Sequence, residues 1–187
     1  MNYDKSDVSL SRRRFSLWEI YNQIIDEALI IDPKQAKKLI PTPDGWKFDI
    51  QIKDEIIPVF IYIEPASIDR FFVADKFKVA QEVINFGFEM GEERDTNQKT
   101  KTDYKNYKTI FSTVGTALQK LVQSKQPEIV TFFSDSKHGG HAADPQKDDI
   151  YLALLERNTI PGYELGDIKE KKSSKKGIML YKIQAFK

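Results

Sequence analysis

The sequence contains no cysteine, which excludes disulfide bonds, thiolate zinc sites and a cysteine nucleophile and fits a reducing compartment. It lacks any run that approaches the ~20 consecutive apolar residues of a membrane span. No apolar run follows the basic cluster near the N-terminus, so we expect no secretory signal. Neither charge is in excess: 29 Lys and Arg face 28 Asp and Glu, a formal net charge of +1. These absences predict a cytoplasmic protein without a membrane partner, and they argue against a nucleic-acid partner.

What is present has globular proportions. Of the 187 residues, 40% are hydrophobic and 30% are charged, which excludes wholesale disorder. The length is near the common size of one domain and is enough to bury one sizeable core. We expect a flexible N-terminal segment over residues 1–11 and a single domain over residues 12–187.

The apolar spacing predicts a definite order of elements. Helical periodicity covers residues 14–29, and a second short helix follows Asp32-Pro33 and ends before Pro41. Further helices are predicted over 104–123 and around 150–155, after an exposed polar loop over 91–103. Strand signals cover residues 46–52, 56–63, 78–90, 128–134, 163–168 and 177–185. This order predicts an α/β (α+β) fold in which one mixed sheet has helices on both faces.

The passage Ser112–Ala117 is a candidate phosphate-binding turn. A turn of small residues at a helix N-terminus exposes backbone N–H groups to a phosphate. The passage resembles the pyrophosphate loop of the GNAT acyltransferase superfamily, although Ser112 stands where that loop has Arg or Gln. The resemblance implies that Val114, Gly115, Thr116 and Ala117 bind acetyl-CoA. The alternative is that the apolar stripe from Tyr107 continues through Gly115, which then lies mid-helix with no free N–H groups.

The order of elements also resembles the GNAT superfamily: two helices, a three-strand meander, then helix, strand, helix and a closing pair of strands. Tyr151 and Gly162-Tyr163 echo a Tyr and a Gly-Phe pair of that family. The resemblance implies that Tyr151 is the acid for the departing thiolate and Glu89 the base for the acceptor amine. A glutamate on a solvated strand face is the alternative for Glu89.

A closer resemblance is to small bacteriophage proteins of GNAT-like fold that have no activity to carry over. It rests on Ile110–Val114, on the apolar strand Pro127–Ser134, and on Tyr151-Leu152 with Gly162-Tyr163. It implies a GNAT-like phage-type protein without acetyl-CoA catalysis or cofactor, which acts through a protein partner in the host cytoplasm or the virion. The first alternative is an active acetyl-CoA-dependent N-acyltransferase.

A second alternative is a metal-dependent nuclease. Asp135-Ser136-Lys137 follows a predicted strand, and Asp-x-Lys at a strand end is part of the divalent-metal site of many nucleases. The upstream acid would be Glu128, Asp103 or Glu89. Nearby, His138 and His141 have zinc-ligating side chains, but a solvated glycine-rich loop explains them more simply, and we predict no metal site.

Two basic runs, Arg12–Arg14 and Lys169–Lys176, are candidates for contacts with phosphates or with an acidic partner. The second run contains no aromatic residue on which a base could stack. It therefore favours a solubilising hairpin loop.

Overall fold

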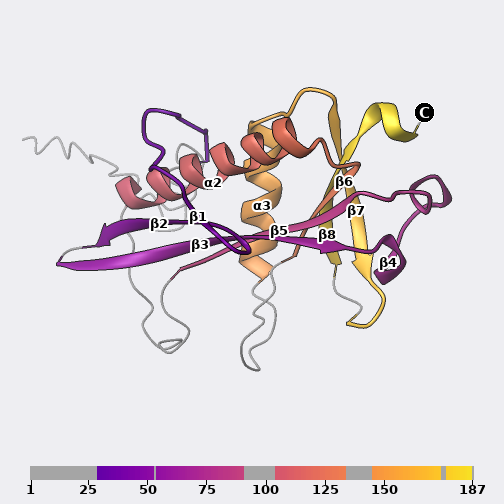
Figure 1. The fold of residues 1–187 in the computed structure, drawn as a ribbon, viewed down its shortest axis with the longest axis horizontal. Coiled ribbons are helices and arrows are strands. Elements are labelled where there is room, and N and C mark those ends of the chain that lie inside the picture. The colour runs from indigo at the N-terminus through magenta and orange to yellow at the C-terminus, as the bar shows by residue number, and fades with distance from the viewer. Residues whose placement is uncertain (1–28, 53, 91–103, 134–144, 174–175, 187) are drawn as a thin grey trace, which may run out of the picture.

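The computed structural model describes residues 29–52, 54–90, 104–133, 145–173 and 176–186 (Figure 1). Its strands are β1 (Ile40–Thr42), β2 (Gly45–Ile52), β3 (Glu55–Ala66), β4 (Phe71–Phe72), β5 (Val83–Met90), β6 (Ile129–Phe132), β7 (Tyr163–Glu170) and β8 (Lys176–Lys182). Its helices are α2 (Tyr104–Lys125) and α3 (Pro145–Arg157), with 3₁₀ turns η1 (Ile68–Arg70), η2 (Asp75–Phe77) and η3 (Ile183–Phe186). None of the helices described is long and apolar enough to cross a membrane.

The described strands form one sheet in the order β1-β2-β3-β5-β6-β8-β7-β4. The pair β5 and β6, joined through α2, is parallel. The other neighbouring pairs are antiparallel. The prediction of a mixed α/β sheet is therefore confirmed.

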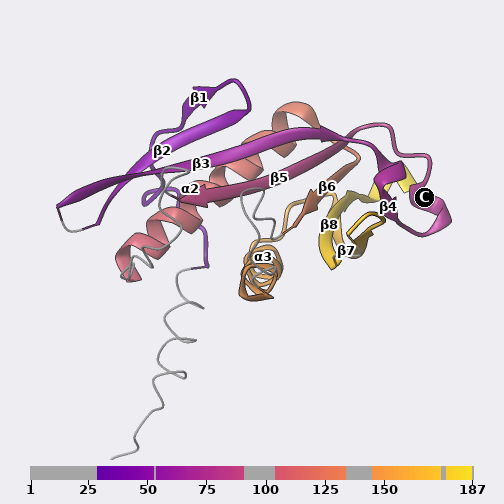
Figure 2. The same ribbon diagram turned by 90° about the horizontal axis from the view of Figure 1, so that it is seen from below.

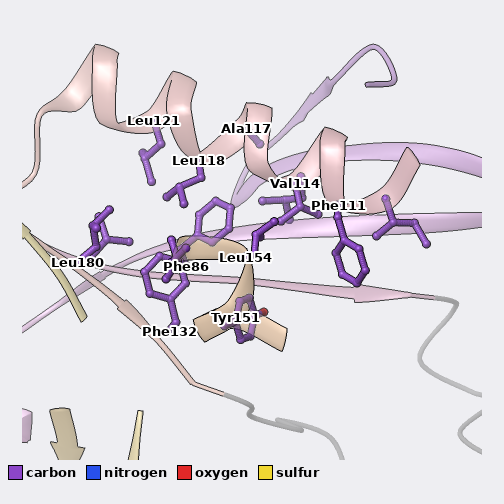
Figure 3. Close-up of a cluster of buried hydrophobic side chains, with 14 of the residues drawn as sticks. Phe86, Phe111, Val114, Ala117, Leu118, Leu121, Phe132, Tyr151, Leu154 and Leu180 are labelled. Atoms are coloured by element: carbon purple, nitrogen blue, oxygen red, sulfur yellow. The ribbon is translucent and has the colours of Figure 1, made fainter. Parts of the chain in front are cut away.

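The core is divided between the two faces of the sheet. The larger cluster joins apolar residues of α2 and α3 to one face, with Phe86, Phe132 and Leu180 among them (Figure 3). Alternate strand residues such as Val83, Ile129 and Met179 point to the other face and form a smaller cluster. That cluster is closed by residues of the three 3₁₀ turns, such as Ile68 and Phe77. The expectation of helices on both faces is thus wrong for the part of the chain described, because both α-helices contribute to the same cluster.

The short helix expected after Asp32-Pro33 is also wrong. Residues 32–39 form turns and extended chain, and side chains of α2 bind two of their backbone N–H groups. The N–H of Asp32 donates to Ser112 Oγ at 3.0 Å, and that of Lys37 donates to Thr113 Oγ1 at 2.9 Å. In the expected helix the Lys37 N–H would donate to Pro33 O, and its bond to Thr113 takes it out of that ladder.

The third strand begins later than expected, at Val83 instead of Lys78. Residues 75–80 are instead taken up by η2 and its following turn, in which Lys78 N–H donates to Asp75 O and Ala80 N–H donates to Phe77 O. At the other end of the chain, η3 replaces the last residues of the strand predicted over 177–185.

Candidate functional site

The two parallel strands β5 and β6 are paired over a short stretch and then diverge. Their paired residues run from Val83 with Ile129 to Asn85 with Thr131. Beyond this point β6 ends at Phe132, whereas β5 continues to Met90. Ligands of open α/β sheets bind outside the carboxyl ends of parallel strands, where backbone groups are free to meet them. The point where β5 diverges from β6 is therefore a candidate ligand-binding site.

This place is occupied by Tyr151 of α3. The Tyr151 side chain is buried, and its hydroxyl accepts a hydrogen bond of 3.2 Å from the backbone N–H of Phe88. Its ring lies 5.7 Å from the rings of both Phe88 and Phe132, centre to centre. Figure 3 shows Tyr151 beside Phe132. Leaving a buried N–H unpaired costs about 1–3 kcal/mol. The hydroxyl therefore substitutes for a strand partner on the side of β5 where the pairing with β6 has ended.

Glu89 lies one residue further along β5, and its side chain points to the opposite face from that of Phe88. The hydroxyl of Tyr62 on β3 donates to Glu89 Oε2 at 2.9 Å. The structure therefore brings the predicted pair Tyr151 and Glu89 to the same end of β5, but it gives each of them a different partner. Their roles as acid and base stay predictions.

Residues Val114–Ala117 are not at a helix N-terminus, so the predicted phosphate-binding turn is wrong. They lie in the middle of α2, where their backbone N–H groups belong to the helix, and Val114 and Ala117 are buried. A Cβ atom at Gly115 would overlap Cδ1 and Cγ1 of Ile31. The alternative, a mid-helix glycine, is confirmed. Binding of acetyl-CoA elsewhere on the chain stays a prediction.

The small residues of Ser112–Ala117 hold the segment 31–37 against α2. Ser112 and Thr113 bind the backbone of the segment 31–37, and Gly115 leaves room for Ile31. The Thr113 hydroxyl also donates to Thr109 O at 2.6 Å. We call this arrangement the Gly115 seat: Ser112, Thr113 and Gly115 of α2, with the segment 31–37 that crosses them. It accounts for the composition that resembled a pyrophosphate loop.

Most residues of the proposed metal sites lie outside the described residues, namely Asp103, Asp135, Lys137, His138 and His141. The nuclease alternative therefore stays a prediction. Glu128 is described, and its Oε2 accepts hydrogen bonds from the N–H groups of Gln81 at 2.6 Å and Glu82 at 3.2 Å. This carboxylate closes the turn before β5. Within the ranges that the structure covers, no group of three or more His, Asp or Glu residues is arranged to hold a metal ion.

A separate hollow of about 480 Å³ lies between the end of α2 and the segment 159–163. Its polar lining is mostly amide, and the Lys182 ammonium donates to Gln126 Oε1 at 3.1 Å. Tyr163, which also lines it, donates to Pro127 O at 2.7 Å. Burial, and then the charge of Glu82, raises the pKa of Tyr163. A phenol held in its neutral form by these groups suits hydrogen bonding better than proton transfer.

Two structural partners were missed from the sequence. Tyr62 had a usable signal, because strand alternation places it on the same face as Glu89 once β3 and β5 are paired. Asn158 had none. Its side chain binds Leu29 O, Ile31 N–H and Leu154 O, and so ties the start of the described chain to the end of α3.

Comparison of the chain with protein-family models, with curated proteins and with solved structures found no significant match. The function is therefore argued from the residues and their geometry.

Proposed function

We propose that the chain is a GNAT-like scaffold of the phage type, which acts by holding a protein partner and not by acetyl transfer. The order of elements supports the GNAT-like assignment: the meander β2-β3-β5, then α2, β6 and α3, and the closing pair β7-β8. This matches the order on which the resemblance rests from the meander onward, whereas the second of its two leading helices is absent from the described residues 32–39. The small-residue passage does not support a cofactor site, because the Gly115 seat accounts for it.

The observation that carries the proposal is the position of Tyr151. In the sheet, the one parallel pair described diverges at β5 and β6, and the chain fills that divergence with its own side chains. Tyr151 caps the Phe88 N–H, the rings of Phe88 and Phe132 pack against it, and Phe86 packs in turn on Phe132. A cofactor arm that entered between the strands would have to displace this aromatic cluster.

The partner surface we infer is the open face of β2, β3 and β5, defined by Ile56, Pro58, Phe60 and Tyr62 of β3 with their neighbours on the two flanking strands. These residues alternate with Val59 and Ile61, which are buried against the helices. Figure 2 shows this face toward the viewer, with α2 behind the strands. Ile56 is 72% exposed, and Phe60 and Tyr62 are half-buried. Aromatic side chains on an accessible face are typical anchors of protein interfaces.

Calorimetric titration of the full chain with acetyl-CoA tests the first part of the proposal, with an active N-acetyltransferase as the positive control. We expect no binding heat and no thermal shift. A ligand at 100 times its Kd stabilises a fold by about 2.7 kcal/mol, so a real site would also raise the melting temperature. Micromolar binding would overturn the proposal and favour the acyltransferase alternative.

Photocrosslinking in cells of the natural source tests the second part. A photoreactive amino acid replaces Ile56 in one variant and Val79 in the control, which is 70% exposed but lies outside the open face, just after η2. We expect the Ile56 variant alone to give a discrete protein adduct, which an excess of the unlabelled chain suppresses. Identical adducts from both positions, or none from the Ile56 position, would contradict the open face as the partner surface.

A further inference from the structure

The edge of the sheet opposite β1 and β2 carries an exposed aromatic ring among lysines. Strand β4 pairs with β7 so that Phe72 lies opposite Lys169, and β7 pairs with β8 so that Lys169 lies opposite Lys176. Directly opposed residues of antiparallel strands share a face of the sheet. The fold therefore supplies the basic run 169–176 with the aromatic residue that this run lacks in the sequence.

Phe72 is held outward by its neighbour. Phe71 is buried and stacks on Phe133 with ring centres 5.5 Å apart, which fixes the short strand β4. Phe72, which points to the other face, is 56% exposed. Burial of a phenylalanine side chain normally stabilises a fold by about 1.5–3 kcal/mol. The Phe72 ring, which stays in solvent on a fixed strand, is therefore a candidate contact for a ligand.

Two ammonium groups lie over this ring. Lys169 Nζ is 6.0 Å and Lys171 Nζ is 5.9 Å from the centre of the Phe72 ring, within the range of a cation–π contact. Arg70 belongs to a different interaction, since its guanidinium forms an ion pair of 3.0 Å with Glu170. The lysines of this end are therefore the groups that remain for an anionic ligand.

The ring and two of the lysines border a shallow hollow of about 310 Å³. It is lined by Phe72, Asp167, Ile168, Lys169, Lys176 and Gly177. We call this site the Phe72 platform, defined by Phe72, Lys169, Lys171 and Lys176. Asp167 is the one carboxylate in that lining, and it opposes the binding of an anion.

We propose that the Phe72 platform binds single-stranded nucleic acid. Proteins that bind single strands combine lysines that follow the phosphates with exposed aromatic rings on which bases stack. An acidic peptide would be held by the lysines but has no need of an exposed ring. A duplex keeps its bases stacked within the helix, so only an unpaired base can reach Phe72. This site is at the other end of the sheet from the open face, and it stands independently of the proposed partner protein.

Fluorescence anisotropy of a labelled oligothymidylate, titrated with the full chain between about 50 and 200 mM salt, tests the proposal. We expect binding that weakens with salt. Phe72→Ala should weaken it about tenfold or more, and Phe72→Trp should retain it. Each of Lys169→Gln and Lys176→Gln should lower the slope of log K against log salt by about 0.7. Asp167→Asn should strengthen binding.

Val79→Ala and Lys125→Gln are the matched controls, because both residues are exposed and neither lines the hollow of the platform. Circular dichroism establishes that each variant is folded. Absence of oligonucleotide binding at about 50 mM salt would overturn the proposal. It would equally be overturned if Phe72→Ala bound as well as the wild type, or if polyglutamate or a DNA duplex competed as effectively as the single strand.

Discussion

Replacing Gly115 by alanine adds a Cβ atom that would overlap Cδ1 and Cγ1 of Ile31. In the interior of a helix the same change contributes about 1 kcal/mol of stability, because alanine is the better helix former. Overpacking of a well-filled site costs about 1–3 kcal/mol. With a mid-range cost of about 2 kcal/mol, Gly115→Ala should lower the free energy of unfolding by about 1 kcal/mol.

The sign reverses when Ile31 is shortened. Ile31→Ala removes both overlapping atoms, and the Cβ atom that remains lies 3.6 Å from the new one, an ordinary van der Waals distance. In that background Gly115→Ala should stabilise the protein by about 1 kcal/mol, which gives a coupling of about 2 kcal/mol between the two positions. Urea unfolding of the wild type, both single variants and the double variant measures it. If Gly115→Ala stabilises both backgrounds equally, the Ile31 side chain does not pack against Gly115.

Two further predictions concern other contacts. Asn158→Ala removes three hydrogen bonds and should lower the free energy of unfolding by about 2–3 kcal/mol, with faster deuterium exchange at the Ile31 amide; a loss below about 0.5 kcal/mol would contradict the tie. The hydrogen bond to Glu164 is the main cause that raises the pKa of Tyr181 above 10.0. The contribution of this hydrogen bond to the stability of the fold is therefore fully present below pH 10 and is lost as the pH rises through the folded-state pKa. Glu164→Ala should return the pKa of Tyr181 toward 10.0 when it is followed by the NMR signal of the isotope-labelled ring, and an unchanged curve would refute the assignment.

The sequence predicts those elements whose apolar pattern is long and whose packing is local. Strict alternation located β2, and the long stripe located α2 from its first turn. The same reasoning failed for residues 32–39, because their conformation is set by hydroxyl groups of α2 and not by their own propensities. The edge strands β1 and β4 were missed because strands of three and two residues have no measurable period.

The candidate site was predictable only in part, and for a similar reason. Small residues in a helix are compatible with a phosphate turn or with a chain that crosses closely, and only the position of Ile31 distinguishes the two. Tyr151 and Glu89 were named through the resemblance to GNAT enzymes, but the partners that hold them, Phe88 N–H and Tyr62, come from pairing geometry. The Phe72 platform joins residues from β4, β7 and β8 that no local pattern connects.

The packing of Tyr151 between Phe88 and Phe132 determines how weak acetyl-CoA binding between these strands should be. Removing a buried aromatic side chain from a core costs about 3–5 kcal/mol. A ligand that must first displace the Tyr151 ring from between Phe88 and Phe132 loses about this much binding free energy, and 3 kcal/mol is roughly a hundredfold in Kd. A slot that would bind at about 1 μM when open would then bind at roughly 0.1 mM. A measured Kd near the micromolar range therefore requires either a slot that does not pass Tyr151 or a ring that moves at little cost. If the ring instead blocks the slot, Tyr151→Ala should bind acetyl-CoA roughly a hundredfold more tightly than the wild type, and equal affinities would refute this blockage.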